Sequence, residues 1–319
     1  MDTEADPIPT PFTEPITMTE LMDSRAVNLL SKNQQIVVMY SGGVDSTAVL
    51  ISFMKNLPEN EWDRLKIYYD EESIQENPEF WRIIEPTKIQ KILLTATEYD
   101  ETMREDDYDL ITSGWCADQL FGSDIHVVVP DAYHMPWIDG VKEAYKVKLN
   151  LPISDKSLEV IESVYSDYAK TFGVTLNQFC EFAWLFNWAV KWGHVANITN
   201  LQLAGSKNSG KGMAFFNTLD FQRWSLGRVD RLHKSHVYRN TILYKRPLKQ
   251  YIYEYNHINS YYMKKGKLNS MIRAQKAAST LTVLTDQGYK IYSFKDCGTC
   301  RAKLIERTLN VFRKIPIQY

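Results

Sequence analysis

The feature that most constrains the fold is a short apolar run that leads through a glycine-rich loop into a second apolar segment. The run covers residues 36–40, the loop at 41–46 reads Ser-Gly-Gly-Val-Asp-Ser, and the second segment covers 47–56. The apolar, β-branched run favours a strand, and the segment after the loop has the length and composition of a helix. Two adjacent glycines allow the sharp turn between them. The chain therefore contains a strand–loop–helix unit, which is typical of parallel α/β folds.

The 41–46 loop has the chemistry of a phosphate-binding socket. Its glycines let an anion approach bare backbone N–H groups, and the following helix presents the positive end of its dipole. Asp45 belongs beside an anion only if a cation accompanies it, so ATP with Mg²⁺ is the expected ligand. The expected contacts of the phosphates come from Ser41, Gly42, Gly43, Asp45, Ser46 and Thr47.

Further strands and helices are expected along the chain. The strands are residues 65–69, 91–95 and 108–112, and the helices include 18–31, which begins with a capping-box sequence at Thr17–Glu20, and 77–85. This alternation predicts an α/β fold with a parallel sheet of about five strands and helices on both faces, followed by a mostly helical C-terminal region. Ligands bind beyond the carboxyl ends of such strands, where Ser41, Asp70 and Ser113 fall.

The loop resembles the SGGxDS loop of the PP-loop ATP pyrophosphatases, which split ATP into AMP and pyrophosphate. The resemblance implies a fold like that of the adenine nucleotide alpha hydrolases. We therefore interpret residues 1–17 as a flexible tail and 18–140 as the nucleotide-binding domain. Residues 141–319 would form a mostly helical substrate and lid region that completes the synthetase domain.

Residues 113–122, Ser-Gly-Trp-Cys-Ala-Asp-Gln-Leu-Phe-Gly, form a second motif after the fourth expected strand. They resemble the SGEGADELFGG segment of asparagine synthetases and β-lactam synthetases. The resemblance implies that Ser113 and Gly114 contact the nucleotide and that Asp118 shares the Mg²⁺ with Asp45. Trp115 stands where the family has a catalytic Glu, and Gln119 replaces its next acid. The reaction need not therefore be asparagine synthesis.

Two lysine-containing segments are candidates for phosphate contacts. Lys245 matches a lysine that neutralises the leaving pyrophosphate in the same synthetases, and Lys249 lies one helical turn further on. Residues 205–212 nearly spell GxxxxGK[ST], but Gly212 stands where a Walker A loop has a hydroxyl. We expect instead a basic lid, in which Lys207 or Lys211 contacts phosphate.

The four cysteines include one close pair, Cys297 and Cys300. Two thiolates at this spacing can share one Zn²⁺. Their surroundings resemble part of the zinc site of the 7-cyano-7-deazaguanine synthases, which are also PP-loop enzymes. The alternative is a pair of unbound thiols in a reducing compartment, and the sequence leaves both open.

Composition excludes several classes of protein. The 319 residues carry a net charge of −2, which gives no electrostatic footprint for nucleic acid. No apolar run approaches the length of a membrane span, and the acidic N-terminus lacks the apolar core of a signal peptide. We therefore expect a cytoplasmic protein without a membrane or nucleic-acid partner.

These patterns predict an AMP-forming carbon–nitrogen ligase that uses ATP and Mg²⁺, with Asp45, Asp118 and Lys245 as its catalytic residues. Its partners would be a small-molecule carboxylate and ammonia or an amine. Because no glutamine-hydrolysing domain is evident, a separate protein could supply the ammonia. Two alternatives remain: a nitrile-forming enzyme like the deazaguanine synthases, and a catalytically decayed nucleotide-binding protein.

Overall fold

The computed structural model describes residues 16–95, 98–121, 132, 134–149, 153–233, 245–258, 280–285 and 288–293. The chain divides into two compact units, Met1–Gly266 and Lys267–Tyr319. Within the described ranges, no helix is both long enough and apolar enough to cross a membrane. The predicted flexible tail, residues 1–17, lies almost entirely outside them.

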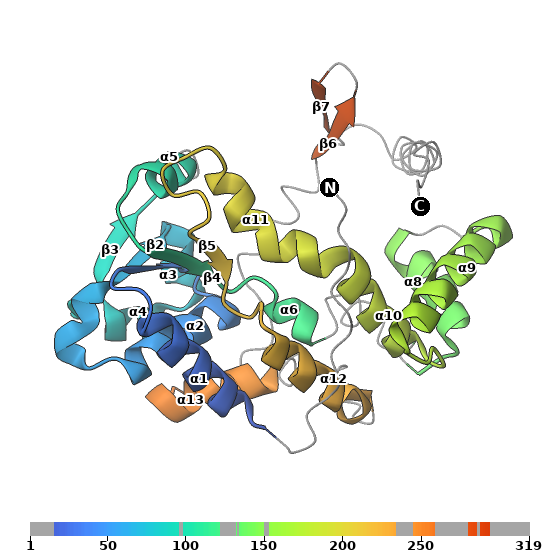
Figure 1. Cartoon of the computed structure of the whole chain (residues 1–319), viewed down its shortest axis with the longest axis horizontal. Coiled ribbons are helices and arrows are strands. Elements are labelled where there is room, and N and C mark those ends of the chain that lie inside the picture. Colours follow the sequence, from blue (N-terminus) through green and yellow to red (C-terminus); the bar gives the residue numbers. More distant parts are fainter. Residues whose placement is uncertain are drawn as a thin grey trace. The chain divides into compact units, whose positions relative to one another are not determined.

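The first unit is built on a sheet of five parallel strands in the order β3-β2-β1-β4-β5 (Figure 1). The strands are β1 (Ile36–Met39), β2 (Leu65–Tyr69), β3 (Gln90–Leu93), β4 (Leu110–Ser113) and β5 (Gly212–Ala214). This arrangement confirms the expected α/β fold with a parallel sheet. Four strands lie within two residues of their predicted positions. The fifth had no predicted position, because three residues reading Gly-Met-Ala carry no strand pattern.

Alternate residues of the strands face opposite sides of the sheet, and both sides are buried. On β1, Ile36 and Val38 belong to one buried cluster, whereas Val37 belongs to another. All three are fully buried. A strand covered on both faces reads as a continuous apolar run, which is why residues 36–40 gave a clear signal.

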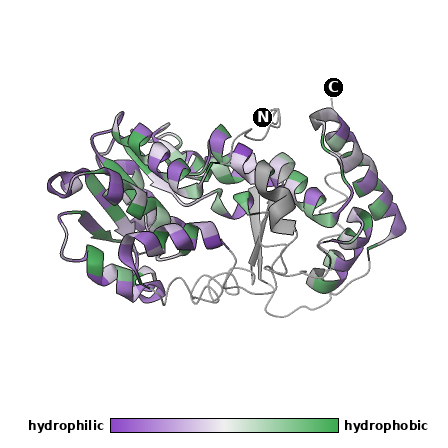
Figure 2. Cartoon of the chain, turned by 90° about the horizontal axis from the view of Figure 1, so that it is seen from below, coloured by the Kyte–Doolittle hydropathy of each residue, from purple (hydrophilic) through white to green (hydrophobic). Residues whose placement is uncertain are grey.

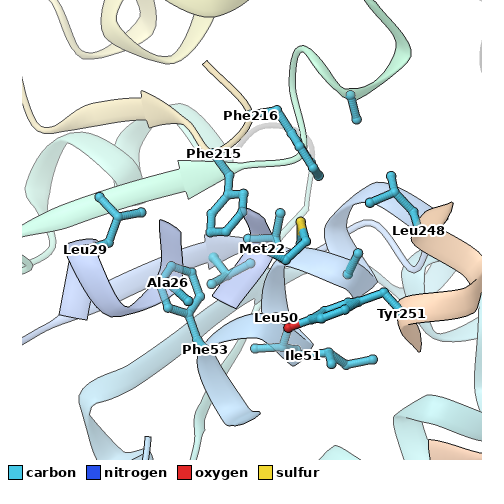
Figure 3. Packing of buried hydrophobic residues seen from close by; sticks show 14 of the residues in the cluster. Met22, Ala26, Leu29, Leu50, Ile51, Phe53, Phe215, Phe216, Leu248 and Tyr251 are labelled. Carbon is cyan, nitrogen blue, oxygen red and sulfur yellow. The ribbon is translucent and has the colours of Figure 1, made fainter. Parts of the chain in front are cut away.

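Three helices cover the first face: α1 (Met18–Leu30), α2 (Val44–Asn56) and α13 (Arg246–Asn256). Figure 3 shows their apolar side chains pointing toward one another and toward two phenylalanines that follow β5. The labelled residues are Met22, Ala26 and Leu29 of α1, Leu50, Ile51 and Phe53 of α2, Phe215 and Phe216, and Leu248 and Tyr251 of α13. Helix α1 begins with the expected capping box, formed by Thr17 and Glu20.

The opposite face is covered by α5 (Glu98–Glu105) and α11 (Gly193–Leu203). Met103 of α5 and Leu203 of α11 pack there against Val37, Tyr68 and Ile111 of the sheet. The sheet is thus a middle layer between two layers of helices. Figure 2 shows that the helices around the sheet carry both hydrophilic and hydrophobic residues, as amphipathic helices on a sheet do.

The remaining elements complete the two units. They are η1 (Glu59–Arg64), α3 (Glu71–Glu76), α4 (Pro78–Ile84), α6 (Ala117–Leu120), α8 (Trp137–Leu149), α9 (Asp155–Phe172), α10 (Phe179–Phe186), the π-helical turn η3 (Asn187–Trp192) and α12 (Leu219–His233). In the second unit, β6 (Thr280–Thr285) and β7 (Gly288–Ser293) pair as an antiparallel hairpin. The helix expected at 77–85 is largely α4, which Asn77 caps.

Candidate functional site

The 41–46 loop joins the carboxyl end of β1 to α2 and is closed by its own serines. The backbone N–H of Ser41 donates to Oγ of Ser46 at 3.1 Å, and the two hydroxyls are also 3.1 Å apart. Gly42 has φ +69°, and a Cβ built on it would lie 2.2 Å from the carbonyl oxygen of Ser73. Only glycine fits there. The loop therefore holds one shape because α3 packs directly against it.

Helix α2 begins at this loop with an N-terminus that no side chain caps. Gly43 is its N-cap residue and forms no side-chain cap hydrogen bond. The first N–H groups of a helix have no partner within the helix, and its dipole favours negative charge. The helix spans 13 residues, and the N-terminus lies at the carboxyl edge of the sheet. This edge can accept a phosphate group.

Three charged side chains meet beside the loop, although they are far apart in sequence. The ammonium of Lys245 lies 2.6 Å from Oδ1 of Asp45 and 2.6 Å from Oδ1 of Asp118. Asp45 and Lys245 are 200 residues apart. These are the three residues that the sequence predicted to be catalytic, and the structure brings them together. We refer to them below as the charged cluster.

Burial and charge together determine the state of Lys245. Its side chain is only 1% exposed, while those of Asp45 and Asp118 are 17% and 34% exposed. Burial lowers the pKa of Lys245, but the carboxylates of Asp118 and Asp45 raise it more, so its pKa lies above the ordinary lysine value. The lysine is therefore protonated near neutral pH. The charged cluster keeps a net negative charge and still attracts cations.

The backbone of Lys245 has an unusual, left-handed conformation. Lys245 has φ 55° and stands immediately before α13, whose first turn contains a proline. A left-handed conformation is uncommon for a residue with a side chain. Here the ion pairs with two carboxylates offset the cost of that conformation. Lys249, one turn further along, is also buried.

Gly114 brings the second motif into contact with the loop. A Cβ on this residue would lie 2.7 Å from Cβ of Asp45 and 3.0 Å from the backbone nitrogen of Ser46. Ser113 is the last residue of β4, which pairs with β1. Ser113 and Gly114, the two predicted nucleotide contacts at the end of β4, therefore lie at the same edge of the sheet as the loop. Cys116, with φ 72°, then turns the chain into α6, which carries Asp118.

Lys211 lies away from this edge, contrary to our expectation of a phosphate contact. Its ammonium donates to the carbonyl oxygen of Tyr108 at 2.8 Å, and its own carbonyl accepts from the N–H of Ile111. Lys211 precedes β5 and Tyr108 precedes β4, so both lie at the amino ends of parallel strands. Lys207 pairs nearby with Asp107. The 41–46 loop follows a carboxyl end, so the basic segment and the loop lie at opposite edges of the sheet.

The charged cluster has the donors that a nucleotide-bound Mg²⁺ uses. Magnesium is commonly bound by one or two carboxylates, with phosphate oxygens and water completing its octahedron. Asp45 and Asp118 supply two carboxylates beside a phosphate-accepting helix end. No group of three or more His, Cys, Asp and Glu side chains that could hold a metal by themselves occurs among the described residues. The set therefore fits a metal that arrives with its nucleotide. Cys297 and Cys300 lie outside the described residues.

The sequence did not predict a narrow space beside α6, which in this structure does not admit a water molecule. It is lined by buried aromatic and amide side chains, namely Gln119, Trp184, Asn187, Trp188, Trp192, Gln222 and Ser225. The aromatic side chains of this run, Phe179, Phe182, Trp184, Trp188 and Trp192, are buried, and Gln119 was visible in the sequence only as a departure from the family pattern. No sequence pattern predicts that these tryptophans lie beside Gln222 and Ser225 of α12.

Comparisons of the sequence with models of known protein families and with curated proteins found no match.

Proposed function

We propose that this chain is an ATP-dependent synthetase that activates a carboxylate as an acyl-adenylate and releases pyrophosphate. The observation that carries the proposal is the charged cluster, in which Lys245 bridges Asp45 and Asp118 beside the N-terminus of α2. The motifs at 41–46 and 113–122, which resemble those of PP-loop synthetases, support the same assignment.

In the first step, a carboxylate oxygen of the substrate attacks the α-phosphorus of ATP. The bond from the α-phosphorus to the oxygen bridging to the β-phosphorus breaks, and pyrophosphate departs with that electron pair. Negative charge thus grows on the β-phosphate. The N-terminus of α2 and the Lys245 ammonium stabilise this charge. When bound, Mg²⁺ would be held by Asp45 and Asp118 and would supply further positive charge to the phosphates.

In the second step, ammonia or an amine attacks the acyl carbon, and AMP leaves. The nitrogen loses a proton to water as the amide forms, and AMP leaves with the electron pair of the broken carbon–oxygen bond. The buried Lys245 is already protonated, so it does not serve as the base in this step. The nitrogen donor is free ammonia, an amine substrate or ammonia passed from a partner protein. Because ATP is an intracellular substrate, we place the reaction in the cytoplasm.

The test is incubation of the protein with ATP, Mg²⁺ and a library of carboxylates and amines, while AMP and pyrophosphate are measured. We expect both products to appear together and to depend on the added carboxylate. Production of ADP and phosphate instead would contradict the proposal. Absence of any turnover with every substrate pool, despite tight ATP binding, would favour a non-catalytic nucleotide-binding protein.

A pair of variants ties the activity to the charged cluster. Asp45→Asn keeps the size of the side chain but removes its charge, so pyrophosphate release should fall about 100-fold, the size typical for losing one electrostatic contact in a transition state. Asp63→Asn is the matched control, because Asp63 is exposed. Equal loss in both variants would show that the effect is not specific to the site.

A further inference from the structure

Lys245 already contacts the carboxylate oxygens that a divalent cation would use. Its ammonium lies 2.6 Å from Oδ1 of Asp45 and 2.6 Å from Oδ1 of Asp118, and it also contacts Oδ2 of Asp45. A lysine ammonium has three N–H donors, so three oxygens are enough to engage all of them. The net negative charge of the charged cluster attracts cations, but a metal ion would have to share these oxygens with the ammonium.

A metal ion and the ammonium would repel each other at this site. Magnesium binds oxygen at about 2.1 Å, so an ion on one of the contacted oxygens would lie within about 5 Å of the ammonium. Two positive charges at that distance repel strongly where water is partly excluded. The side chain of Lys245 is only 1% exposed, so little water screens it. A free divalent cation can therefore bind both carboxylates only if the ammonium moves away from them.

The fold keeps the ammonium beside the carboxylates. Leu248, Tyr251 and Ile252 anchor α13 in the core that this helix shares with α1 and α2. Lys245 directly precedes α13, so its backbone is held there too. An ammonium that lost its counter-charges while still buried would be strongly destabilised. It should therefore leave the carboxylates only when another anion accepts it.

A phosphate at the N-terminus of α2 is an anion that can do so. Asp45 belongs to the first turn of α2, and the N-cap residue Gly43 forms no side-chain cap hydrogen bond. A phosphate that binds the first N–H groups of this helix would lie beside Asp45, and hence close to the ammonium. Asp45 and Asp118 are 17% and 34% exposed, so both can be reached from outside.

We propose that Lys245 excludes free divalent cations from Asp45 and Asp118, and releases these carboxylates only when a nucleotide phosphate accepts its ammonium. Metal and nucleotide then enter together, and neither Mg²⁺ nor Mn²⁺ alone fills the site. The ligand class is a divalent cation carried by a polyphosphate. This inference rests on the proposed function for the identity of that polyphosphate, whereas exclusion of the free ion follows from the charged cluster itself.

The test uses Mn²⁺ alone, with no nucleotide, and measures bound ion from the loss of the free-ion signal in electron paramagnetic resonance. Carboxylates suit Mn²⁺ as they suit Mg²⁺. We expect the unmodified protein to bind Mn²⁺ weakly and Lys245→Met to bind it more tightly by about tenfold or more, because the positive charge beside both acids is lost. Lys245→Arg keeps that charge and should bind as weakly as the unmodified protein. Equal affinities of the unmodified protein and Lys245→Met would overturn the inference.

Two further variants show whether the gain in affinity belongs to this site. Lys55 pairs with Asp23 at 2.5 Å, so Lys55→Met removes the same charge from a lysine–aspartate pair outside the charged cluster. It should leave Mn²⁺ affinity unchanged, and a gain as large as that of Lys245→Met would contradict the inference. Addition of Asp118→Asn to Lys245→Met should remove the gain. If the gain persists, the ion binds elsewhere and the inference fails.

Thermal unfolding of the unmodified protein gives a measurement that does not depend on how well the variants fold. A ligand that binds only the folded state raises Tm. Mn²⁺ alone should leave Tm unchanged, whereas Mn²⁺ with ATP should raise it more than ATP with a chelator does. A rise with Mn²⁺ alone that Asp118→Asn removes would overturn the inference. Because these readouts need no turnover, pyrophosphate release can be absent while the inference holds, or present while it fails.

Discussion

Lys245 neutralises one of two carboxylates that would otherwise repel each other and the phosphates of a nucleotide. Its ammonium contacts Asp45 and Asp118 at once, and its side chain is almost fully buried. A lysine so placed can exchange one carboxylate contact for a phosphate oxygen without crossing the site. In the proposed reaction, the positive charge that stabilises the leaving pyrophosphate is therefore already in place before ATP binds.

We expect Lys245→Met to reduce pyrophosphate release about 100-fold, because a positive charge beside the leaving group is lost while side-chain length is kept. The measurement is the initial rate of pyrophosphate formation with the best substrate. Lys88→Met is the control, since Lys88 is exposed. Activity of Lys245→Met within threefold of the unmodified protein would contradict the role assigned to the ammonium.

Replacement of Gly114 should disturb the proposed nucleotide site directly. In Gly114→Ala, the new Cβ would press on Asp45 and Ser46. Overpacking of this kind costs about 1–3 kcal/mol, so Tm should fall and ATP should bind at least tenfold more weakly. Thermal unfolding and calorimetric titration with ATP would measure both effects.

Gly193→Ala provides the comparison for that prediction. A Cβ on Gly193, at the start of α11, has no atom within 4 Å. Alanine is favoured over glycine within a helix by about 1 kcal/mol. Stability should therefore be unchanged or slightly increased, with ATP binding unaffected. A fall in ATP affinity in both variants would point to a general effect of the added methyl groups.

Among the elements, β2 and the segment after α5 are joined by a polar cluster on the face opposite α2. Lys66 donates to Asp106 at 2.6 Å, and the hydroxyl of Tyr68 donates to the same carboxylate. Burial raises the pKa of Asp106, but hydrogen bonds from Lys66 and Tyr68 lower it more, so its pKa lies below the usual aspartate value. The ionised form is therefore favoured by folding.

We expect Asp106→Asn to lower stability by about 2 kcal/mol at neutral pH, the size of a lost hydrogen bond to a charged group. A depressed pKa gives stability that is present above the unfolded value near 4 and is lost as the pH falls through the folded value. The difference between the two proteins should therefore shrink below about pH 4. Urea unfolding at pH 7 and pH 3.5 would measure it. A constant difference would argue against this linkage.

Some of the helices and strands could be predicted from local sequence, and others could not. The four longer strands and α1 and α2 were predictable because their apolar periodicity and caps are local. The strand β5 and the position of Lys211 were not, since they depend on how residues 205–214 pair with β4. A glycine-rich segment near a strand looks the same whether it comes before the amino end or after the carboxyl end.

Some residues of the candidate site could likewise be predicted from local sequence, and others could not. Ser41, Gly42 and Asp45 were predictable because a loop between a strand and a helix has few available shapes. The choice of Lys245 depended on a family resemblance, and its contact with both acids was not predicted, because no local pattern relates residues 200 positions apart. The proximity of Gln119 and Gln222 could not be predicted, because it depends on the packing of α6 against α12 in the folded chain.

At the scale of the whole molecule, the buried clusters of described residues all belong to the first unit. They include residues from α1 to Ile258, so the sheet and its helices have a core of their own. A domain with its own core can in principle fold alone.

We therefore expect a chain ending at Gly266 to unfold cooperatively and to bind ATP with an affinity within threefold of the full chain. Circular dichroism during heating and calorimetric titration would test this. A chain ending at Asn208 is the informative comparison, because it lacks β5 and α13 and should not unfold cooperatively. Aggregation of both chains would show that residues beyond 266 are needed for folding.

The long sequence separation between Asp45 and Lys245 also affects the protein while the ribosome is making it. The loop and α2 leave the ribosome long before α13 does, so the two acids face each other without their cation until nearly the whole first unit has been made. A partly synthesised chain could hold nucleotide only loosely. The proposed use of ATP would therefore become possible only late in translation, when α13 docks and Lys245 reaches the acids.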